Sequence, residues 1–241
     1  WIVPISNLSE CELAMLGNNI RPAKRRHHRS PDERANRRVV AAVNLEIPGY
    51  DEPVTGRIHS LPEQGGPRLN VPWLRLGRLP DPDSDAEVTV SEEFAAAQGL
   101  EPGDSLVAII KGRRKALAIV GLAISPEYMY AIPPGAIFPD HERYAILWMS
   151  RRALATAFDM EGAFNDASFS LQPGARQADV IDAIDDLLDR YGGLGAYARE
   201  DQLSHRFITE ELRSLQTMAT VFPVIFLGVA AFLLNVVVTR L

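Results

Sequence analysis

Four acidic side chains alternate along the segment DPDSDAE, which is the pattern in the sequence closest to a metal site. They are Asp81, Asp83, Asp85 and Glu87. A calcium loop supplies oxygen ligands from alternate positions in this way, but it also needs Gly at its sixth position. Here that position holds Ala86, so the G-x₅-E frame is absent. We therefore interpret the segment as a solvated turn, with metal binding as the weaker alternative.

A second acidic group falls within the segment QADVIDAIDDLLDRYGG, for which we predict a helix. Its acids are Asp182, Asp185, Asp186 and Asp189, and its apolar residues are Ile181, Ile184, Leu187 and Leu188. At 3.6 residues per turn the two sets occupy largely opposite sides of the helix. The acids are best explained as the solvated face.

No pattern typical of nucleophilic or nucleotide chemistry is present. The sequence has no G-x-S-x-G elbow and no G-x-x-x-x-G-K-[ST] phosphate loop. His59, His141 and His205 fall in separate predicted elements, and Cys11 lies in the least regular part of the chain. We predict no catalytic, cofactor-binding or metal-binding residues and no enzymatic activity.

Charge is distributed unevenly along the 241 residues. The net charge of −6 argues against nucleic acid as a partner. Between 21 and 38 there are eight Lys and Arg against two acids, whereas from Val39 onward there are 17 basic and 27 acidic residues. We predict an irregular basic arm over 1–38, with contact to lipid headgroups as the alternative. His27 and His28 within it lack partners at metal-ligand spacing.

The stretch TVFPVIFLGVAAFLLNVVVTRL closes the chain. No charged residue occurs between Ser214 and Thr239, and apolar side chains surround the expected helix axis. A helix of about 20 residues crosses the ~30 Å hydrocarbon layer, so we predict a transmembrane helix over 217–239. The alternative is a fully buried core helix. Asn235 favours contact with a neighbouring helix, although a position near the headgroups explains it equally well, and Arg240 favours a cytoplasmic C-terminal end.

Periodicity and turn residues predict the remaining elements. Strands are expected at 38–49, 55–62, 86–90, 144–150, 164–173 and 196–199, and two more are expected as a hairpin within 101–125. Helices are expected at 91–100, 151–160, 177–193 and 203–216, and a Pro- and Gly-rich loop at 65–85. Ser91 is the expected N-cap of the first helix and Gly99 its C-terminal stop. The rhythm after Tyr144 predicts an α/β layer.

The segment 90–135 resembles the extracytoplasmic domain of FtsX/MacB-type ABC transporter permeases. The residues that carry this resemblance are Gly99-Leu100, Pro102-Gly103-Asp104, Gly112, Val120-Gly121 and Ser125-Pro126-Glu127-Tyr128. The likeness extends over roughly Val39 to Leu241. Before Val39 the family places a helix where this sequence has the basic arm.

The resemblance implies an α+β fold. We expect an α/β subdomain over 39–66 and 141–199, a β-rich inserted subdomain over 67–140, and a connecting helix over 200–216 that continues into the membrane. The resemblance further implies one span before the domain and two more spans after the one that this C-terminal helix forms. The chain begins with Trp1, so we expect it to be part of a longer protein.

In function, the resemblance implies an ABC transporter permease of the plasma (inner) membrane whose main domain is extracytoplasmic. Expected partners are a separate ABC ATPase subunit, a second permease copy in a homo- or heterodimer, and membrane lipid, with no cofactor. The alternative is a membrane-anchored extracytoplasmic sensor or scaffold without transport. A soluble enzyme would instead remain in solution without detergent.

Overall fold

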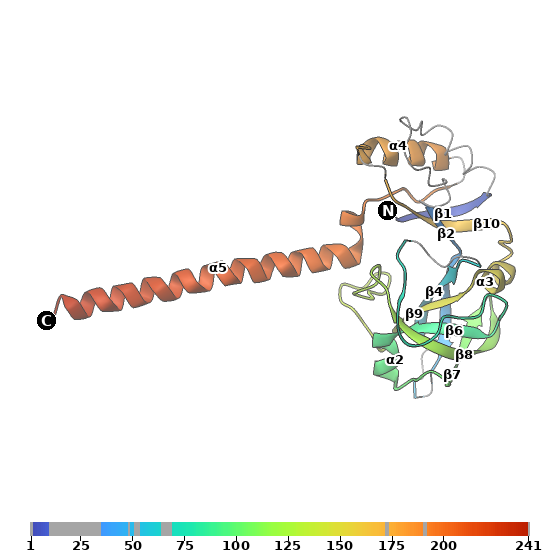
Figure 1. Ribbon diagram of the computed structural model, residues 1–241, viewed down its shortest axis with the longest axis horizontal. Helices are drawn as coiled ribbons and strands as arrows, with labels where there is room; N and C mark the ends of the chain where they lie inside the picture. The colour runs from blue at the N-terminus through green and yellow to red at the C-terminus, as the bar shows by residue number, and fades with distance from the viewer. Residues whose placement is uncertain are drawn as a thin grey trace. The chain divides into compact units, whose positions relative to one another are not determined.

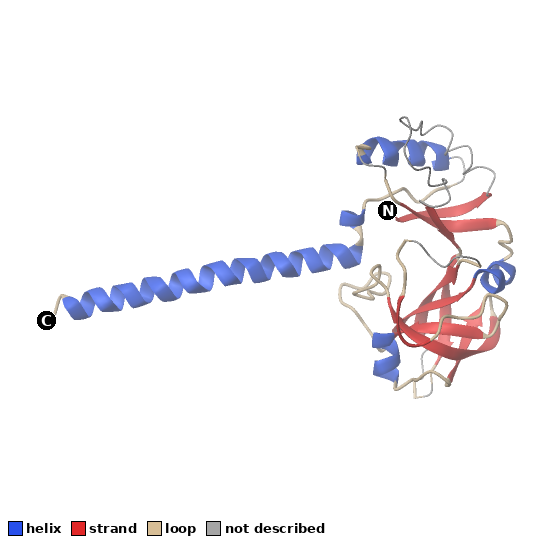
Figure 2. Ribbon diagram, in the orientation of Figure 1, coloured by secondary structure: helices blue, strands red, loops and turns tan. Residues whose placement is uncertain are grey.

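A computed structural model describes residues 2–9, 35–47, 49–50, 54–63, 69–171, 174–189 and 192–240. The chain divides into two compact units, residues 1–199 and 200–241. The first unit holds all the described strands and the second holds the long C-terminal helix (Figures 1 and 2). The fold is of the mixed α and β class, as predicted.

The larger sheet of the first unit closes on itself. Its strands run in the order β5-β8-β6-β9-β4-β3-β7, and β7 also pairs with β8. The bounds are β3 Val40–Glu46, β4 Val54–Leu61, β5 Trp73–Gly77, β6 Glu87–Ser91, β7 Ser105–Ile110, β8 Arg113–Ile124 and β9 Tyr144–Ser150. The extra pairing joins six strands into a ring and leaves β5 outside it, attached to the end of β8.

Apolar side chains from every strand of the ring form the main core. They include Val43, Leu45, Ile58, Val88, Val90, Leu106, Ala108, Leu117, Ile119, Leu147 and Met149. Strand β9 is buried on both faces, because Tyr144, Ile146 and Trp148 enter a second core on its other side. This explains the continuous apolar run YAILWMS, since a strand covered on both faces has no need to alternate.

Two short helices cover this sheet, each starting directly after a strand. Helix α2 (Glu92–Gln98) ends at Gly99 in the left-handed region, as predicted. Helix α3 (Arg151–Phe158) is capped by the Ser150 hydroxyl, which accepts from the Ala153 N–H. Ser91 occupies the predicted N-cap position of α2 but makes no side-chain cap; its hydroxyl accepts instead from the Ile146 N–H at 3.3 Å.

A separate three-stranded sheet completes the first unit. Its order is β1 (Ile2–Ser9), β10 (Ala163–Phe169) and β2 (Ala35–Arg38), all antiparallel. Helix α4 (Gln177–Leu188) packs on it through a small core of Phe164, Ala167, Ile184 and Leu188. The helix begins at Gln177 as predicted but ends five residues before the predicted position 193, and the Gly193 N–H donates to the carbonyl of its last residue, Leu188, at 3.0 Å.

Several expectations need correction. The arm over 1–38 was predicted to be irregular, but 2–9 and 35–38 are strands; residues 10–34 lie outside the described part. The prediction failed at 35–38 because the arginines conceal the alternation, and their pairing with β10 comes from a segment far along the chain.

The strands also pair across the predicted subdomain boundaries. Strands from within 67–140 share one sheet with β3, β4 and β9, because β4 pairs with β9 and β9 pairs with β6. The segment 65–85 was predicted to be a loop but contains β5; the prediction failed because Pro72 precedes the strand and Gly77 ends it, and both residue types are typical of loops. The predicted strand at 196–199 is not an element of the described sheets.

The second unit contains helix α5 (Leu203–Val238), preceded by the 3₁₀ turn Arg199–Asp201 at the boundary of the two units. As predicted, the polar start of α5 continues into the apolar segment without a break, and Pro223 lies inside the helix. Among the described residues α5 is the one helix whose length and composition suit a membrane crossing. Its apolar side chains are exposed, Phe226 by 72% and Leu227 by 69%.

Candidate functional site

The four alternating acids in 81–87 are held by four different interactions. Glu87 accepts both arms of the Arg78 guanidinium at 2.6 Å, Asp81 accepts from the Asp83 N–H at 2.8 Å, and Asp85 pairs with Lys115 at 2.7 Å. Asp83 pairs with Arg152 at 3.0 Å. The carboxylates are therefore directed to separate partners around a turn.

The acids of α4 follow the predicted solvated face with one exception. Asp182, Asp186 and Asp189 are exposed, but Asp185 is half-buried and accepts from the Ala196 N–H at 2.6 Å. Asp185 thereby fixes the chain that leaves the helix. The three histidines lie in separate elements: His59 on β4, His141 on the loop before β9 and His205 on α5. Within the first unit, His59 is the register partner of Trp148, whereas His141 precedes the start of β9, so these two histidines do not share a site.

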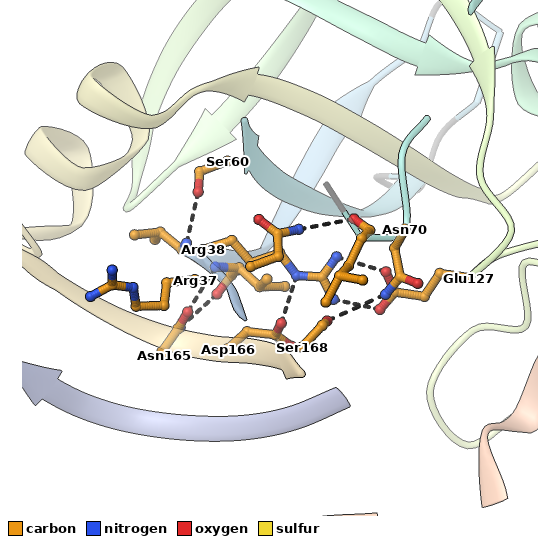
Figure 3. A network of polar contacts seen from close by, with 12 residues as sticks. Arg37, Arg38, Ser60, Asn70, Glu127, Asn165, Asp166 and Ser168 are labelled. Carbon is orange, nitrogen blue, oxygen red and sulfur yellow. Dashed lines mark hydrogen bonds and ion pairs between the residues drawn. The ribbon is translucent and has the colours of Figure 1, made fainter. Parts of the chain in front are cut away.

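The most unusual chemistry in the first unit is a buried ion cluster centred on Arg38. Its Nε donates to Asp166 Oδ1 at 2.6 Å, while Nη1 and Nη2 donate to Glu127 at 2.6 and 2.5 Å. All three side chains are less than 10% exposed. Figure 3 shows Arg38 lying between the two carboxylates. We call Arg38, Glu127 and Asp166 the junction cluster.

The junction cluster connects the two sheets. Arg38 ends β2 and Asp166 is its register partner on β10, so both belong to the three-stranded sheet. Glu127 comes from the segment after β8 of the ring, where a turn holds it: its N–H donates to the Ser125 hydroxyl at 3.2 Å. One arginine therefore binds a carboxylate from each side.

The backbone crosses between the sheets at the same place. Only Val39 separates β2 from β3, and its N–H donates to the Ser60 hydroxyl at 2.8 Å. The Asn165 side chain accepts from the Val40 N–H and donates to the Val40 carbonyl, both at 2.7 Å. These bonds, which Figure 3 also shows, fix the chain where it passes from one sheet to the other.

Burial and nearby charges shift the pKa values of the cluster. Burial acts to lower the pKa of Arg38, but Asp166 and Glu127 outweigh it and raise that pKa well above its ordinary value. Burial, with Glu127 nearby, raises the pKa of Asp166 despite Arg38. Burial and then the same two carboxylates raise the pKa of Tyr197 to about 12. The Arg57 guanidinium on β4 also acts on Asp166 and Tyr197 as a cation and opposes both of these rises.

His59 lies beside the junction cluster. His59 is 1% exposed on β4, its ring centroid is 5.1 Å from that of Tyr128, and its register partner on β9 is Trp148. Burial, followed by the charges of Arg38 and Arg57, lowers the pKa of His59 well below its ordinary value. A neutral imidazole is the form that this environment favours.

The arrangement suits a structural connection better than a reaction. The arginine is engaged on three nitrogens, and the carboxylates lie too deep to meet a substrate. Breaking a buried pair leaves an uncompensated charge, so such a cluster enforces one arrangement of the parts that it joins. We interpret the junction cluster as the element that fixes the two sheets against each other.

Sequence reasoning did not find this cluster. Arg38 was assigned to the basic arm, and its partners lie 89 and 128 residues away. One signal was available: Asp166 is a single charge inside the strand sequence FNDASF, at a position that the structure buries. A lone acid at a core position requires a cation, but nothing in the sequence says which one.

The motif residues behind the family resemblance all occupy turns or close contacts. The Gly103 N–H bonds the Ile119 carbonyl at 2.8 Å, and Lys111-Gly112 forms a two-residue hairpin turn with positive φ at both residues. A Cβ on Gly121 would lie 2.2 Å from the Arg78 carbonyl oxygen. Ser125-Pro126-Glu127-Tyr128 forms the turn that delivers Glu127 to the junction cluster.

Comparison with known proteins gives the following. No family model matches the sequence, and no curated protein matches it. The fold is similar to the periplasmic region of MacB from Actinobacillus actinomycetemcomitans, with a TM-score of 0.45, 12% identity, and 87% of this chain and 84% of that one covered.

Two further solved structures are similar. One is the extracellular domain of the noncanonic ABC-type transporter YknZ from Gram-positive bacteria, with a TM-score of 0.43, 14% identity, and 79% and 87% of the two chains covered. The other is a domain of a putative permease protein from Porphyromonas gingivalis, with a TM-score of 0.33, 15% identity, and 70% of each chain covered.

Proposed function

We propose that this chain is the extracytoplasmic domain and the following transmembrane helix of an ABC transporter permease. In this proposal it has no catalytic activity of its own. It couples the movement of a separate ATPase subunit to export or extraction of a substrate, and it acts together with a second permease copy in the plasma (inner) membrane.

The observation that carries the proposal is the continuity of α5. The helix runs for 36 residues, about 54 Å, from a polar segment into an apolar one. The apolar part over 217–239 is about 34 Å long, enough for the ~30 Å hydrocarbon layer. Residues 203–216 then form a connecting rod of roughly 21 Å. A continuous helix transmits axial and tilting motion, whereas a flexible linker does not.

The surface of the rod supports a place in a larger assembly. Leu212 and Leu215, one turn apart on its polar part, are 60% and 62% exposed. Leucines at this spacing form the stripe by which helices pack against one another. We infer that another helix of the transporter covers this stripe.

The junction cluster supports the same mechanism. A force entering through α5 reaches the substrate-facing parts of the domain only if the sheets move together. Three charge-assisted hydrogen bonds in a dry site resist their separation. The family resemblance of the turn that presents Glu127 agrees with this role.

The first experiment is to express the natural protein, solubilise the membranes and test whether an ATPase subunit co-purifies. We expect co-purification, with ATP hydrolysis that disappears when the nucleotide site of the partner is mutated. A protein that emerges alone would contradict the transporter proposal and favour a sensor or scaffold.

A second experiment tests the rod. Insertion of Gly-Pro after Glu211 breaks the helix, whereas insertion of Ala-Ala at the same place shifts its phase equally and keeps it continuous. We expect Gly-Pro to uncouple transport from ATP hydrolysis more severely than Ala-Ala. Equal transport by the two insertion variants would contradict the rod mechanism.

A further inference from the structure

His59 occupies a position that apolar residues could fill more simply. The ring is 1% exposed, and neither of its nitrogens has a hydrogen-bond partner among the described residues. It borders a small cavity at the junction of the sheets. The cavity is lined by Asn36, Arg38, Ser60, Leu61, Asn70, Pro72 and Trp148 as well as His59. A buried polar group without partners is costly, so its presence calls for a reason other than packing.

The charged and titratable groups around the ring favour its neutral form. Arg38 comes from β2 and Arg57 from β4, and both act on the imidazole as cations. The Tyr128 ring, from the segment after β8, contacts the imidazole at a tilt of 51°, and Glu127 and Asp166 are both bound by Arg38. No carboxylate of the described residues bonds the imidazole.

Protonation would therefore introduce a third cation beside the two arginines. The added charge would have no acceptor of its own, and it would repel the guanidinium that binds both sheets. Tyr128 lies against the ring and follows Glu127 directly in the chain, so movement of the charged ring toward water would displace the turn that presents Glu127. That movement takes Glu127 away from Arg38.

We propose that the protonation state of His59 controls the junction cluster, and we call this the release. When the imidazole is neutral, the bonds of Arg38 to Glu127 and Asp166 hold the two sheets together. When the imidazole is protonated, these bonds break and the sheets separate. The release is a property of the domain itself and does not depend on the proposed transport function. Its consequence is that the rigidity of the domain follows the pH of the compartment around it.

The direction of the effect follows from linkage. The pKa of His59 is lower in the folded protein than its ordinary value of about 6.5, so the unfolded or opened form binds the proton more tightly. The stabilisation is complete above about pH 6.5 and decreases as the pH falls through the lower, folded value.

The test uses the full-length chain in detergent, with its tryptophan emission, to which the buried Trp148 contributes, followed from about pH 8 to about pH 4. His59→Phe keeps the stacked ring and His59→Gln keeps a polar group, and neither titrates. We expect a wild-type transition that moves down by at least about one pH unit in both variants. His141→Gln is the matched control, because it also removes a histidine beside β9 and should leave the wild-type transition in place.

Two results would overturn the release. The first is an unchanged acid transition in both His59 variants, which would assign it to the carboxylates of the cluster. The second result comes from the wild type alone, so it can be obtained even if a variant fails to fold. As the pH falls, the release predicts that hydrogen exchange, corrected for its intrinsic pH dependence, rises at β2 and β10 before it rises at β9. Simultaneous loss of protection in all three strands would show that the protein unfolds without a separate release.

Discussion

Two arginine–carboxylate pairs in this domain share one geometry and differ in their surroundings. Arg38 holds Glu127 through both terminal nitrogens at 2.6 and 2.5 Å, and Arg78 holds Glu87 through both at 2.6 Å. The first pair is 5% and 3% exposed, whereas the second is 57% and 21% exposed. Distance alone would make them equivalent.

Their surroundings give the two pairs different roles. Around Arg78, water solvates both partners whether or not they meet, so the pair adds little. Around Arg38 the side chains are buried, and each member of the cluster depends on the others to offset its desolvation. The surface pair orders a turn, while the buried cluster determines whether two sheets stay together.

The largest effect should come from removing the shared cation. In Arg38→Ala, two buried carboxylates lose the guanidinium that binds them both, which should cost about 3–5 kcal/mol of unfolding free energy. Urea titration of the detergent-solubilised chain, followed by tryptophan emission, measures this. A loss as small as that of a surface substitution would mean that water enters the junction freely.

Removing all three charges together should cost much less than removing one. In the triple variant Arg38→Met, Glu127→Gln and Asp166→Asn, no buried ion remains uncompensated. We therefore expect the triple variant to recover most of the stability lost in Arg38→Ala, although the sheets would then lack their specific lock. If the three substitutions add up instead of compensating, the cluster is not a single energetic unit.

The same contrast explains what the sequence could and could not predict. Local signals identified most of the strands and helices, because turns such as Lys111-Gly112 and stops such as Gly99 act within a few residues. The pairing of β3 with β7, which closes the ring, and the junction cluster join distant segments of the chain. Arg38 and Arg78 look alike in sequence, since burial is a property of the fold.

An intermediate effect should come from Asp166, the carboxylate that accepts a single bond from Arg38. Asp166→Asn keeps an acceptor and removes one buried carboxylate charge, so its cost should approach that of one buried hydrogen bond, about 1–3 kcal/mol. Removing this charge should also lower the pKa of Tyr197 from about 12, because Asp166 helps to raise it. Absorbance titration of the tyrosines, with Tyr197→Phe to identify the signal, measures this shift.

The pH dependence of Asp166 has a defined sign. Its pKa is raised in the folded protein, so protonation favours the folded state, and the associated stability is present below the unfolded value and is lost as the pH rises through the folded one. Asp166→Asn should remove this contribution. An unchanged slope of stability against pH in the acid range would contradict the raised pKa.

The smallest effect should come from the surface pair. In Glu87→Gln the amide oxygen can take the place of Oε2 and still accept from Arg78 Nη1 and from the Asp81 N–H, while the bond from Arg78 Nη2 is lost, so the turn over 81–87 should keep its shape. The Glu87 carboxylate has a lowered pKa through its bonds to Arg78 and the Asp81 N–H. Its contribution to stability is therefore present above the unfolded pKa and is lost as the pH falls through the folded one.

Salt should distinguish the surface pair from the buried cluster. Because Arg78 and Glu87 both face water, added salt should remove the difference in stability between Glu87→Gln and the wild type. The stability lost in Arg38→Ala should persist at about 1 M salt, because screening over roughly 3 Å acts in water and not among buried groups. Unfolding measured at low and high salt for the two variants side by side decides the matter: equal salt sensitivity would mean that burial does not separate the two pairs.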